Sequence, residues 1–315
     1  KIELIRLHTF DAADVQFGDA LVSSSVVLFR KATPGSSHEV RMTSGRLREP
    51  AVDFSVPQAD LRKLDKWRRV LRTEGDHEIH SGSKLGDYLK VTRGIATGRN
   101  SFFIRPRSDW LELGIDERFL RPILQSGSKL EGRVISANGD GYPDLPSPLA
   151  VLDCEIPLSE VKEECPPLFD YLMSEEAQKA KESYLASRRT PWYGQEERAP
   201  SPFIWTYMGR SDNGESPFRV LVNRSDAIAK NSLHQVYALG DLERYLREHP
   251  ADDVVVAETL EAVAAESYLD NGRVYGGGLH KLEPQEIEGL PADKLEERFG
   301  LTPSDDASEN QLNLL

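Results

Sequence analysis

Short apolar segments divide this chain into strand-like and helix-like stretches. Leu4–Phe10 and Ala20–Phe29 have the apolar runs that predict β-strands, and the two could pair as a hairpin or as a sheet edge. Phe203–Met208 and Phe218–Val222 predict another strand pair, with a turn at 211–214 between them. Shorter strands are predicted at Leu85–Val91, Ser101–Ile104 and Leu149–Leu152.

Helical patterns lie between these strands. Residues 57–75 repeat apolar side chains at helical spacing above a basic face, which is typical of a solvated helix surface or of a helix that faces phosphates. The pair Pro166-Pro167 predicts the start of a long helix that runs to about Ser187. Val254–Tyr268 predicts a buried helix, and 116–124 a short one, whereas 31–56 is expected to be irregular.

These elements predict an α+β fold. We expect a domain of mixed or antiparallel strands with flanking helices from about Ser81 to Gly300. The first two strands are too short to form a domain by themselves, so we expect them to belong to a larger sheet. The chain begins at Lys1, without a methionine, and we expect it to be a piece of a longer polypeptide that carries the rest of that sheet.

Charge and cysteine content narrow the functional classes. The 315 residues carry a net charge of −13, and most of it lies in 241–315, where 6 Lys/Arg stand against 18 Asp/Glu. This balance argues against strong non-specific binding of nucleic acid, although a local basic face remains possible. Two cysteines are too few for a disulfide framework or a four-cysteine zinc site, and no apolar run approaches the ~20 residues of a membrane span. We therefore expect a cytoplasmic protein without a membrane partner.

Self-contained catalytic motifs are missing from the sequence. It has no phosphate-binding P-loop, no Gly-x-Gly-x-x-Gly after a strand, no His-Glu-x-x-His and no Gly-x-Ser-x-Gly. His77 and His80 resemble a metal pair, but further ligands at a suitable spacing are lacking, which favours a solvated loop. The run Gly276–Gly278 fits a tight turn as well as a close approach to a phosphate.

Four other segments are rich in side chains that bind nucleic acid. Glycines in a loop allow close backbone approach, arginine forks fit phosphate oxygens or the guanine edge, and aromatic rings stack on unpaired bases. Each segment alone is also typical of a solvated loop with cap and turn residues. The four segments are Val91–Asn100, Ser187–Tyr193, Asn223–His234 and Arg273–Pro284.

In these segments the sequence resembles the C-terminal part of adenine-N6 DNA methyltransferases of restriction–modification systems, in which a target-recognition domain follows the catalytic domain. The resemblance is carried by Gly94–Phe103, by Arg189–Tyr193 with the strand Phe203–Arg210, and by Gly276–Pro284. Residues 7–31 resemble the closing strands of that family's methyltransferase sheet, which implies that they are edge strands of an α/β sheet.

The chain departs from a whole enzyme of this family. The Asn/Asp-Pro-Pro-Tyr/Phe motif, which holds a flipped adenine, is absent, because the only Pro-Pro follows Cys165 and precedes Leu168. The glycine-rich loop for S-adenosylmethionine is absent too. The resemblance therefore implies that the parent is a site-specific DNA adenine methyltransferase that uses S-adenosylmethionine. It also implies that this part alone is inactive and contains neither catalytic residues nor cofactor.

The resemblance implies contacts with double-stranded DNA, and it implies the upstream methyltransferase catalytic domain as a second partner. Base edges give sequence specificity, whereas phosphate contacts fix orientation. Near bases or the displaced strand we expect Arg99, Asn100, Arg188, Arg189 and Trp192. At phosphates we expect Arg93, Lys129, Arg224, Lys230 and Lys281. The remaining candidates in these segments are Thr97, Tyr193, Asn231 and His234.

The expected organisation has four parts: closing methyltransferase strands at 1–31, a linker and basic helix at 32–80, the DNA target-recognition domain at 81–300, and a flexible tail at 301–315. One alternative is a non-catalytic interaction or specificity subunit that positions a partner enzyme, which the acidic last quarter would suit. A complete enzyme that uses scattered Asp, Glu and His is a third possibility.

Overall fold

The computed structural model describes residues 1–11, 14, 16–17, 24–64, 67, 70, 82–210, 216–275 and 279–303. These residues form a mixed α+β fold with four sheets, of which one lies before residue 60 and three lie after residue 88. None of the described helices is both long and apolar enough to cross a membrane.

The first sheet has the strand order β2-β1-β3-β4. Its strands are β1 (Glu3–Thr9), β2 (Ser25–Arg30), β3 (Glu39–Gly45) and β4 (Pro50–Pro57), followed by the short helix α1 (Gln58–Leu61). β1 pairs antiparallel with β2, which confirms the predicted pairing of the first two strands. β1 also pairs in parallel with β3, which pairs antiparallel with β4.

The expectation that 31–56 is irregular was wrong, because it overlooked two alternating segments. Val40 and Met42 are buried, while Glu39 and Arg41 between and beside them are exposed. The pattern of period two therefore was present in the sequence, but the glycines and prolines around it obscured it. Of the predicted basic helix at 57–75, α1 is the described part, and most of the remainder lies outside the described residues.

A five-stranded sheet with the order β5-β13-β10-β12-β8 forms the centre of what we call the first lobe. Its strands are β5 (Leu89–Arg93), β8 (Val134–Ile135), β10 (Phe203–Thr206), β12 (Val220–Asn223) and β13 (Leu233–Ala238). The helices α7 (Gly240–Glu248), α8 (Asp253–Asn271), α9 (Pro284–Glu288) and α10 (Asp293–Phe299) pack with it around one apolar core. The antiparallel pairing of β10 with β12 and the buried helix at 254–268 confirm two predictions.

A small three-stranded sheet extends this lobe. It joins β11 (Met208–Arg210), β15 (Leu279–Lys281) and β14 (Arg273–Tyr275) in antiparallel order.

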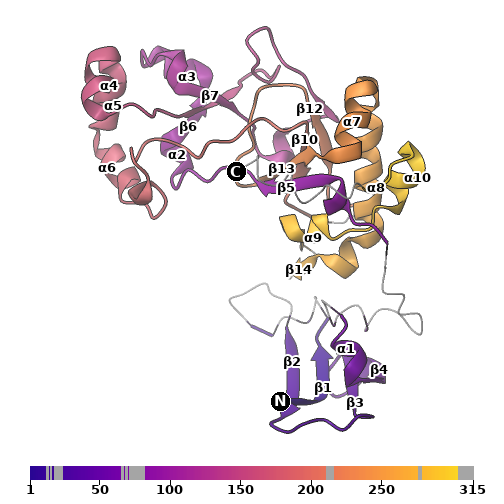
Figure 1. Cartoon of the computed structure of the whole chain (residues 1–315). Coiled ribbons are helices and arrows are strands. Elements are labelled where there is room, and N and C mark those ends of the chain that lie inside the picture. Colours follow the sequence, from indigo (N-terminus) through magenta and orange to yellow (C-terminus); the bar gives the residue numbers. More distant parts are fainter. Residues whose placement is uncertain are drawn as a thin grey trace.

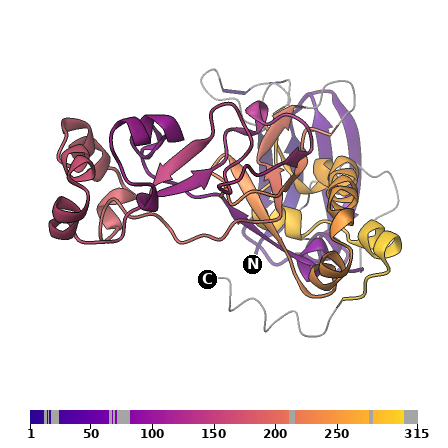
Figure 2. The same ribbon diagram turned by 90° about the horizontal axis from the view of Figure 1, so that it is seen from above.

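The second lobe surrounds the sheet β6-β9-β7. It contains β6 (Ile104–Pro106), β7 (Leu120–Ile123), β9 (Leu149–Leu152), α2 (Asn100–Phe103), α3 (Arg107–Glu112), α4 (Leu158–Glu164), α5 (Pro166–Leu172) and α6 (Glu175–Lys181). Figure 1 shows α3–α6 gathered on one side and α7–α10 on the other, and the view from above in Figure 2 agrees.

Three expectations in the second lobe need correction. The long helix predicted from Pro166 is broken, because the Ser174 side chain caps the start of α6 by accepting from Ala177 N at 3.2 Å. The stretch 116–124 holds only a 3₁₀ turn (Glu117–Phe119) before it enters strand β7. Most of the strand predicted at Ser101–Ile104 is helix α2, whose two phenylalanines are buried.

The chain passes between the two lobes four times, through residues 94–99, 124–133, 136–148 and 189–202. We call the place where these connections meet the seam. A small apolar cluster there includes Leu124, Ala229 and Leu233 and joins loops to the five-stranded sheet. The seam is therefore a packed junction.

Candidate nucleic-acid interface

The loop 94–99 connects β5 to α2 and lies against the turn before β13. Gly94 N donates to Leu233 O at 2.9 Å, Ile95 N to Ala229 O at 2.9 Å, and Asn231 N to Ile95 O at 2.9 Å. A Cβ atom at position 94 would lie only 2.3 Å from Lys230 O. Glycine is therefore needed for this close approach, which brings the first and third predicted segments together.

The far end of the same loop contacts the segment that follows α6. Gly98 has a φ of +86°, and a Cβ there would meet Ser183 Oγ at 2.6 Å. Thr97 is buried, and its hydroxyl donates to Asn100 Oδ1 at 2.8 Å and accepts from Arg99 N at 3.2 Å. These bonds fix Arg99, which is half-buried, and Asn100, which is exposed, at the start of α2.

Arg189 lies beneath this loop. Its Nη2 donates to Ala96 O at 2.5 Å, and its Nη1 donates to Thr97 O at 3.3 Å and to Gln195 Oε1 at 3.0 Å. Burial lowers the pKa of the guanidinium, while the carboxylates of Glu196 and Asp153 oppose that shift. The structure thus places Arg189 inside the junction, with its side chain bonded to protein groups.

The two aromatic candidates after Arg189 belong to the core of the second lobe. Trp192 is half-buried and its ring lies 5.9 Å from that of Phe102 and 5.6 Å from that of Tyr193. Tyr193 is buried, and its hydroxyl donates to Ile156 O at 2.7 Å. Arg188 differs, because it is exposed and lies over the ring of Tyr184.

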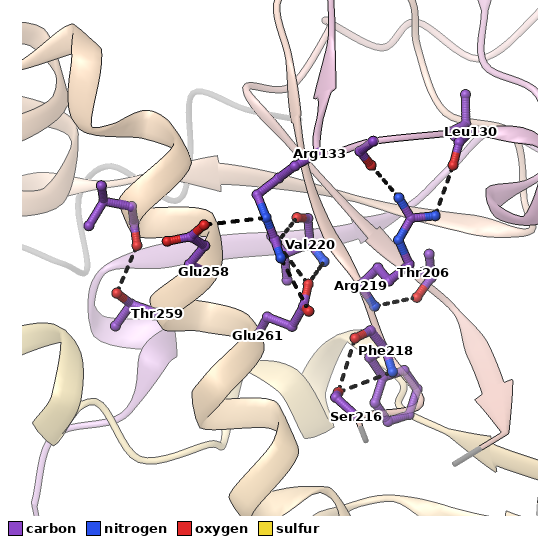
Figure 3. A network of polar contacts seen from close by, with 12 residues as sticks. Leu130, Arg133, Thr206, Ser216, Phe218, Arg219, Val220, Glu258, Thr259 and Glu261 are labelled. Atoms are coloured by element: carbon purple, nitrogen blue, oxygen red, sulfur yellow. Dashed lines mark hydrogen bonds and ion pairs between the residues drawn. The ribbon is translucent and has the colours of Figure 1, made fainter. Parts of the chain in front are cut away.

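Lys129 lies on the connection 124–133, which is anchored to the first lobe. Arg219 Nη1 donates to Leu130 O at 2.8 Å, and Arg133 Nη1 lies 2.8 Å from Glu261 Oε2 on α8, as Figure 3 shows. A Cβ at Gly127 would lie 3.3 Å from Leu233, so this connection packs on the turn that begins at Lys230.

Lys129 and Lys230 therefore come from different connections but lie close together. Burial lowers the pKa of Lys230, and the positive charge of Lys129 lowers it further. Lys129 is exposed and Lys230 is half-buried. The repulsion between these two lysine charges would decrease if an anion bound beside them.

Other predicted cations are already paired with carboxylates. Arg93 Nη2 lies 2.6 Å and Lys281 Nζ 2.7 Å from Glu283, whose pKa these two cations hold at about 2 although burial opposes the shift. Arg224 forms two hydrogen bonds of 2.9 Å with Asp253 at the start of α8.

His234 and Asn231 have opposite environments. The His234 ring is buried, its Nε2 lies 2.9 Å from Leu282 O, and burial lowers its pKa to about 4. His234 is therefore neutral near pH 7. Asn231 is exposed in the turn that contacts the loop 94–99.

The four predicted segments are thus contiguous in space. Along the loop 94–99, one end contacts the turn at 229–231 and the other end contacts 183–186, while Arg93 and His234 link to Glu283 and Leu282 of the fourth segment. Gly276–Gly278 lies outside the described residues. Within the described ranges, five of the candidate cations form no ion pair with a carboxylate: Arg99, Lys129, Arg188, Arg189 and Lys230. Of these, Arg189 is bonded to carbonyl and amide oxygens instead.

Within the described ranges, no three His, Cys, Asp or Glu side chains are grouped to hold a metal ion, and His77 and His80 lie outside those ranges. Both cysteines are buried, and burial raises the pKa of the Cys154 thiol to about 11, which leaves it protonated.

Sequence reasoning missed the residues that hold these loops in place. Gln195 Oε1 accepts a hydrogen bond from Arg189. Arg219 and Glu261 bind the connection 124–133 through Leu130 and Arg133. The partners of Arg219 and Glu261 lie far away in the sequence, so no local signal marks these two residues. Gln195 lies only six residues from Arg189, but its sequence context does not indicate the contact. The one available hint was the isolated charge of Arg219 inside an apolar strand pattern.

Comparisons with known proteins bear on the whole arrangement. The sequence model of the family described as "Type II methyltransferase M.Eco57I, C-terminal domain" matches residues 70–309. The chain is 27% identical over 230 residues to the type II methyltransferase M.AccI of Acinetobacter calcoaceticus, which covers 73% of this chain and 40% of that protein. It is 24% identical over 301 residues to the type II methyltransferase M.XamI of Xanthomonas campestris pv. amaranthicola, which covers 93% and 52%.

The chain therefore spans about half the length of these relatives, or less. Among solved structures, the type IIL restriction-modification enzyme MmeI in complex with DNA matches 99% of this chain and 45% of its own, with 13% identity. Its TM-score of 0.43 is too low to support an argument about this protein.

Proposed function

Because this chain belongs to the family of the C-terminal domain of type II methyltransferase M.Eco57I, we propose that it is the sequence-specific DNA-recognition part of a restriction–modification adenine-N6 DNA methyltransferase. The catalytic half, which would bind S-adenosylmethionine and transfer the methyl group, lies outside this chain in our proposal. We assign no residue of this chain to catalysis or to the cofactor.

The observation that carries the proposal is the convergence of unpaired cations in an acidic protein. Arg99, Lys129, Arg188 and Lys230 come from four segments that contact one another around the loop 94–99 and the turn at 229–231, whereas carboxylates neutralise Arg93, Arg224 and Lys281. A net charge of −13 makes such a cluster unexpected unless it binds an anion. A duplex carries closely spaced phosphates and fits a cluster of this kind.

The side-chain chemistry of the candidates also suggests which of them contact phosphates and which contact bases. We propose that Lys129 and Lys230 contact phosphates, because they lie on segments that pack together, lack a carboxylate partner among the described residues and carry no planar fork. Arg99 and Asn100 can form bidentate contacts with guanine and adenine edges, and Asn231 is exposed beside them. We propose that Arg188 contacts the displaced strand or a base, since its neighbour Tyr184 supplies an exposed ring.

The upstream catalytic domain is the second proposed partner. Every residue of β2 is exposed, including Val26, Val27, Leu28 and Phe29, at 42–55% of their surface. A strand with apolar side chains and an open edge calls for a covering partner. Because the relatives are about twice as long as the matched region, the occupant we propose is their remaining, catalytic part.

The test uses the natural full-length protein and a random pool of short duplexes. We expect selection of one recognition sequence, with binding that weakens as salt concentration rises. The variant Lys129→Ala/Lys230→Ala should bind all duplexes more weakly and still prefer the selected sequence. Salt-independent or absent duplex binding by the wild type would contradict the proposal and favour a subunit that only positions a partner enzyme.

A further inference from the structure

A row of polar contacts runs through the second lobe toward the loop 94–99. It begins at the end of β9, where Asp153 accepts from Arg121 Nη1 at 2.9 Å and from Gln195 N at 2.8 Å. The Gln195 side chain is oriented by two bonds, because its Nε2 donates to Leu152 O at 3.1 Å while its Oε1 accepts from Arg189 at 3.0 Å.

Arg189 extends this row of contacts to the loop 94–99. Its guanidinium bonds the consecutive carbonyl groups of Ala96 and Thr97, at 2.5 and 3.3 Å. The Thr97 hydroxyl then bonds both Arg99 N and the Asn100 side chain. Asp153, Gln195, Arg189 and Thr97 thus connect the core of the lobe to Arg99 and Asn100, the two side chains that we propose to face the bases.

We propose that Arg189 is a positioning residue, which together with Gln195 and Asp153 fixes the loop 94–99 and thereby sets the placement of Arg99 and Asn100. The functional half of this statement rests on the proposed DNA recognition, whereas the structural half does not. The inference replaces the sequence-based expectation that Arg189 itself lies against a base.

The geometry supports this role for a physical reason. The planar fork of arginine can bond two neighbouring carbonyl oxygens and the Gln195 amide oxygen at once, which a single ammonium group does less well. A guanidinium engaged in this way cannot also present its fork to guanine O6 and N7. A base-reading role would require breaking three partly buried hydrogen bonds within the protein.

The first experiment measures amide hydrogen exchange in the full-length protein without DNA. In Arg189→Ala, the amides of Ile95 and Arg99 should exchange faster, by about tenfold or more, because the loop opens locally. Arg189→Lys should restore little of this protection, since lysine lacks the fork. The neighbouring variant Arg188→Ala is the matched control and should leave both amides unchanged. Unchanged exchange in Arg189→Ala would overturn the proposal, whether or not the protein binds DNA.

The second experiment is a double-mutant cycle on binding to the selected duplex. Arg189→Ala should weaken binding by about tenfold or more in the wild-type background, because two base contacts are displaced together. It should have almost no effect in the Arg99→Ala/Asn100→Ala background, and it should leave the salt slope unchanged. Relaxed preference at a single base pair that persists in that background would show direct base reading and would overturn the proposal. Absence of any sequence preference in the wild type would refute the proposed function instead, and the exchange experiment would still decide the role of Arg189.

Discussion

At the scale of single residues, the partner of each charge decides what that charge can do. Lys230 and Lys281 are both lysines in predicted DNA-binding segments, yet Lys281 forms an ion pair with Glu283, while Lys230 forms none among the described residues and has its pKa lowered by burial and by the charge of Lys129. A paired lysine gains little from a phosphate, because it must give up its carboxylate first. An unpaired lysine beside a second lysine gains more.

The proposed phosphate contact of Lys230 can be tested by the salt dependence of duplex binding. In Lys230→Ala, the affinity for all duplexes should fall and the slope of log affinity against log salt should decrease by roughly one, since one phosphate contact is lost. Lys281→Ala should leave the slope unchanged. The measurement is a duplex-binding titration at several salt concentrations, and equal slopes for Lys230→Ala and the wild type would remove Lys230 from the phosphate contacts.

The burial of His234 predicts how the stability of the chain depends on pH. Burial lowers its pKa to about 4 in the folded chain, from an ordinary value of 6.5. Between these two values the unfolded chain binds a proton that the folded chain does not, so stability falls as the pH falls from about 6.5 to about 4. We expect His234→Gln to reduce this loss by about 1–3 kcal/mol.

Denaturant unfolding of both proteins at pH 7, 5.5 and 4.5 measures the effect. Glu283 does not interfere strongly, because its pKa of about 2 places its own loss of stability at lower pH, below its ordinary value of 4.5. Parallel pH curves for wild type and His234→Gln would contradict the assignment.

At the scale of elements, the seam depends on loops that lie unusually close to one another. The loop 94–99 touches the turn at 229–231 through backbone groups alone, and Arg219 holds the connection 124–133 by its carbonyl groups. Such loops keep side chains such as Arg99 and Lys129 in place without burying them. Their rigidity comes from contacts of the backbone with distant parts of the chain.

A substitution at Gly94 tests the close approach between the loop 94–99 and the turn at 229–231. Gly94→Ala would place a Cβ 2.3 Å from Lys230 O and 2.5 Å from Ala229 O, so the backbone must shift. We expect a loss of about 1–3 kcal/mol in unfolding free energy. Gly139→Ala is the control, because nothing lies within 4 Å of its added Cβ, and it should change stability little. Thermal or denaturant unfolding distinguishes the two, and equal stabilities would show that the turns can move apart freely.

Strands and helices with long apolar patterns were predicted correctly. The predictions failed where tertiary packing or a single cap determined the secondary structure. The apolar run of β12 and the helix at 254–268 were predictable, since their apolar residues could be buried in one way only. Phe102 and Phe103 gave no such guidance, because two adjacent aromatic residues fit a strand or a helix equally well. The Ser174 cap likewise divides α5 from α6 through one local bond that outweighs the helical composition around it.

At the scale of the whole molecule, the exposed strand β2 is the surface that we propose the catalytic half to cover. Its apolar side chains contribute little to the stability of the chain when they face solvent, but they would be buried against the proposed catalytic half. The same substitution should therefore have different effects in the two contexts.

We expect Val27→Asn/Phe29→Asn to lower the unfolding temperature of the full-length protein while leaving that of this chain nearly unchanged. Burial of two such side chains is worth about 3–6 kcal/mol. Leu111→Asn, on the second lobe and 44% exposed, is the control that should affect neither protein. An unchanged unfolding temperature of the full-length double variant would show that β2 is not covered there.

The sequence by itself determined the family and the mixed α+β character, because the stretches that resemble the family and the apolar patterns of the longer strands and helices are local features of the chain. The tertiary structure alone decided which cations are unpaired. Glu283 lies 190 residues from Arg93, and the carbonyl of Ala96 lies 93 residues from Arg189. Partners so distant leave no pattern in the local sequence, yet they determine whether an arginine can bind DNA or holds a loop.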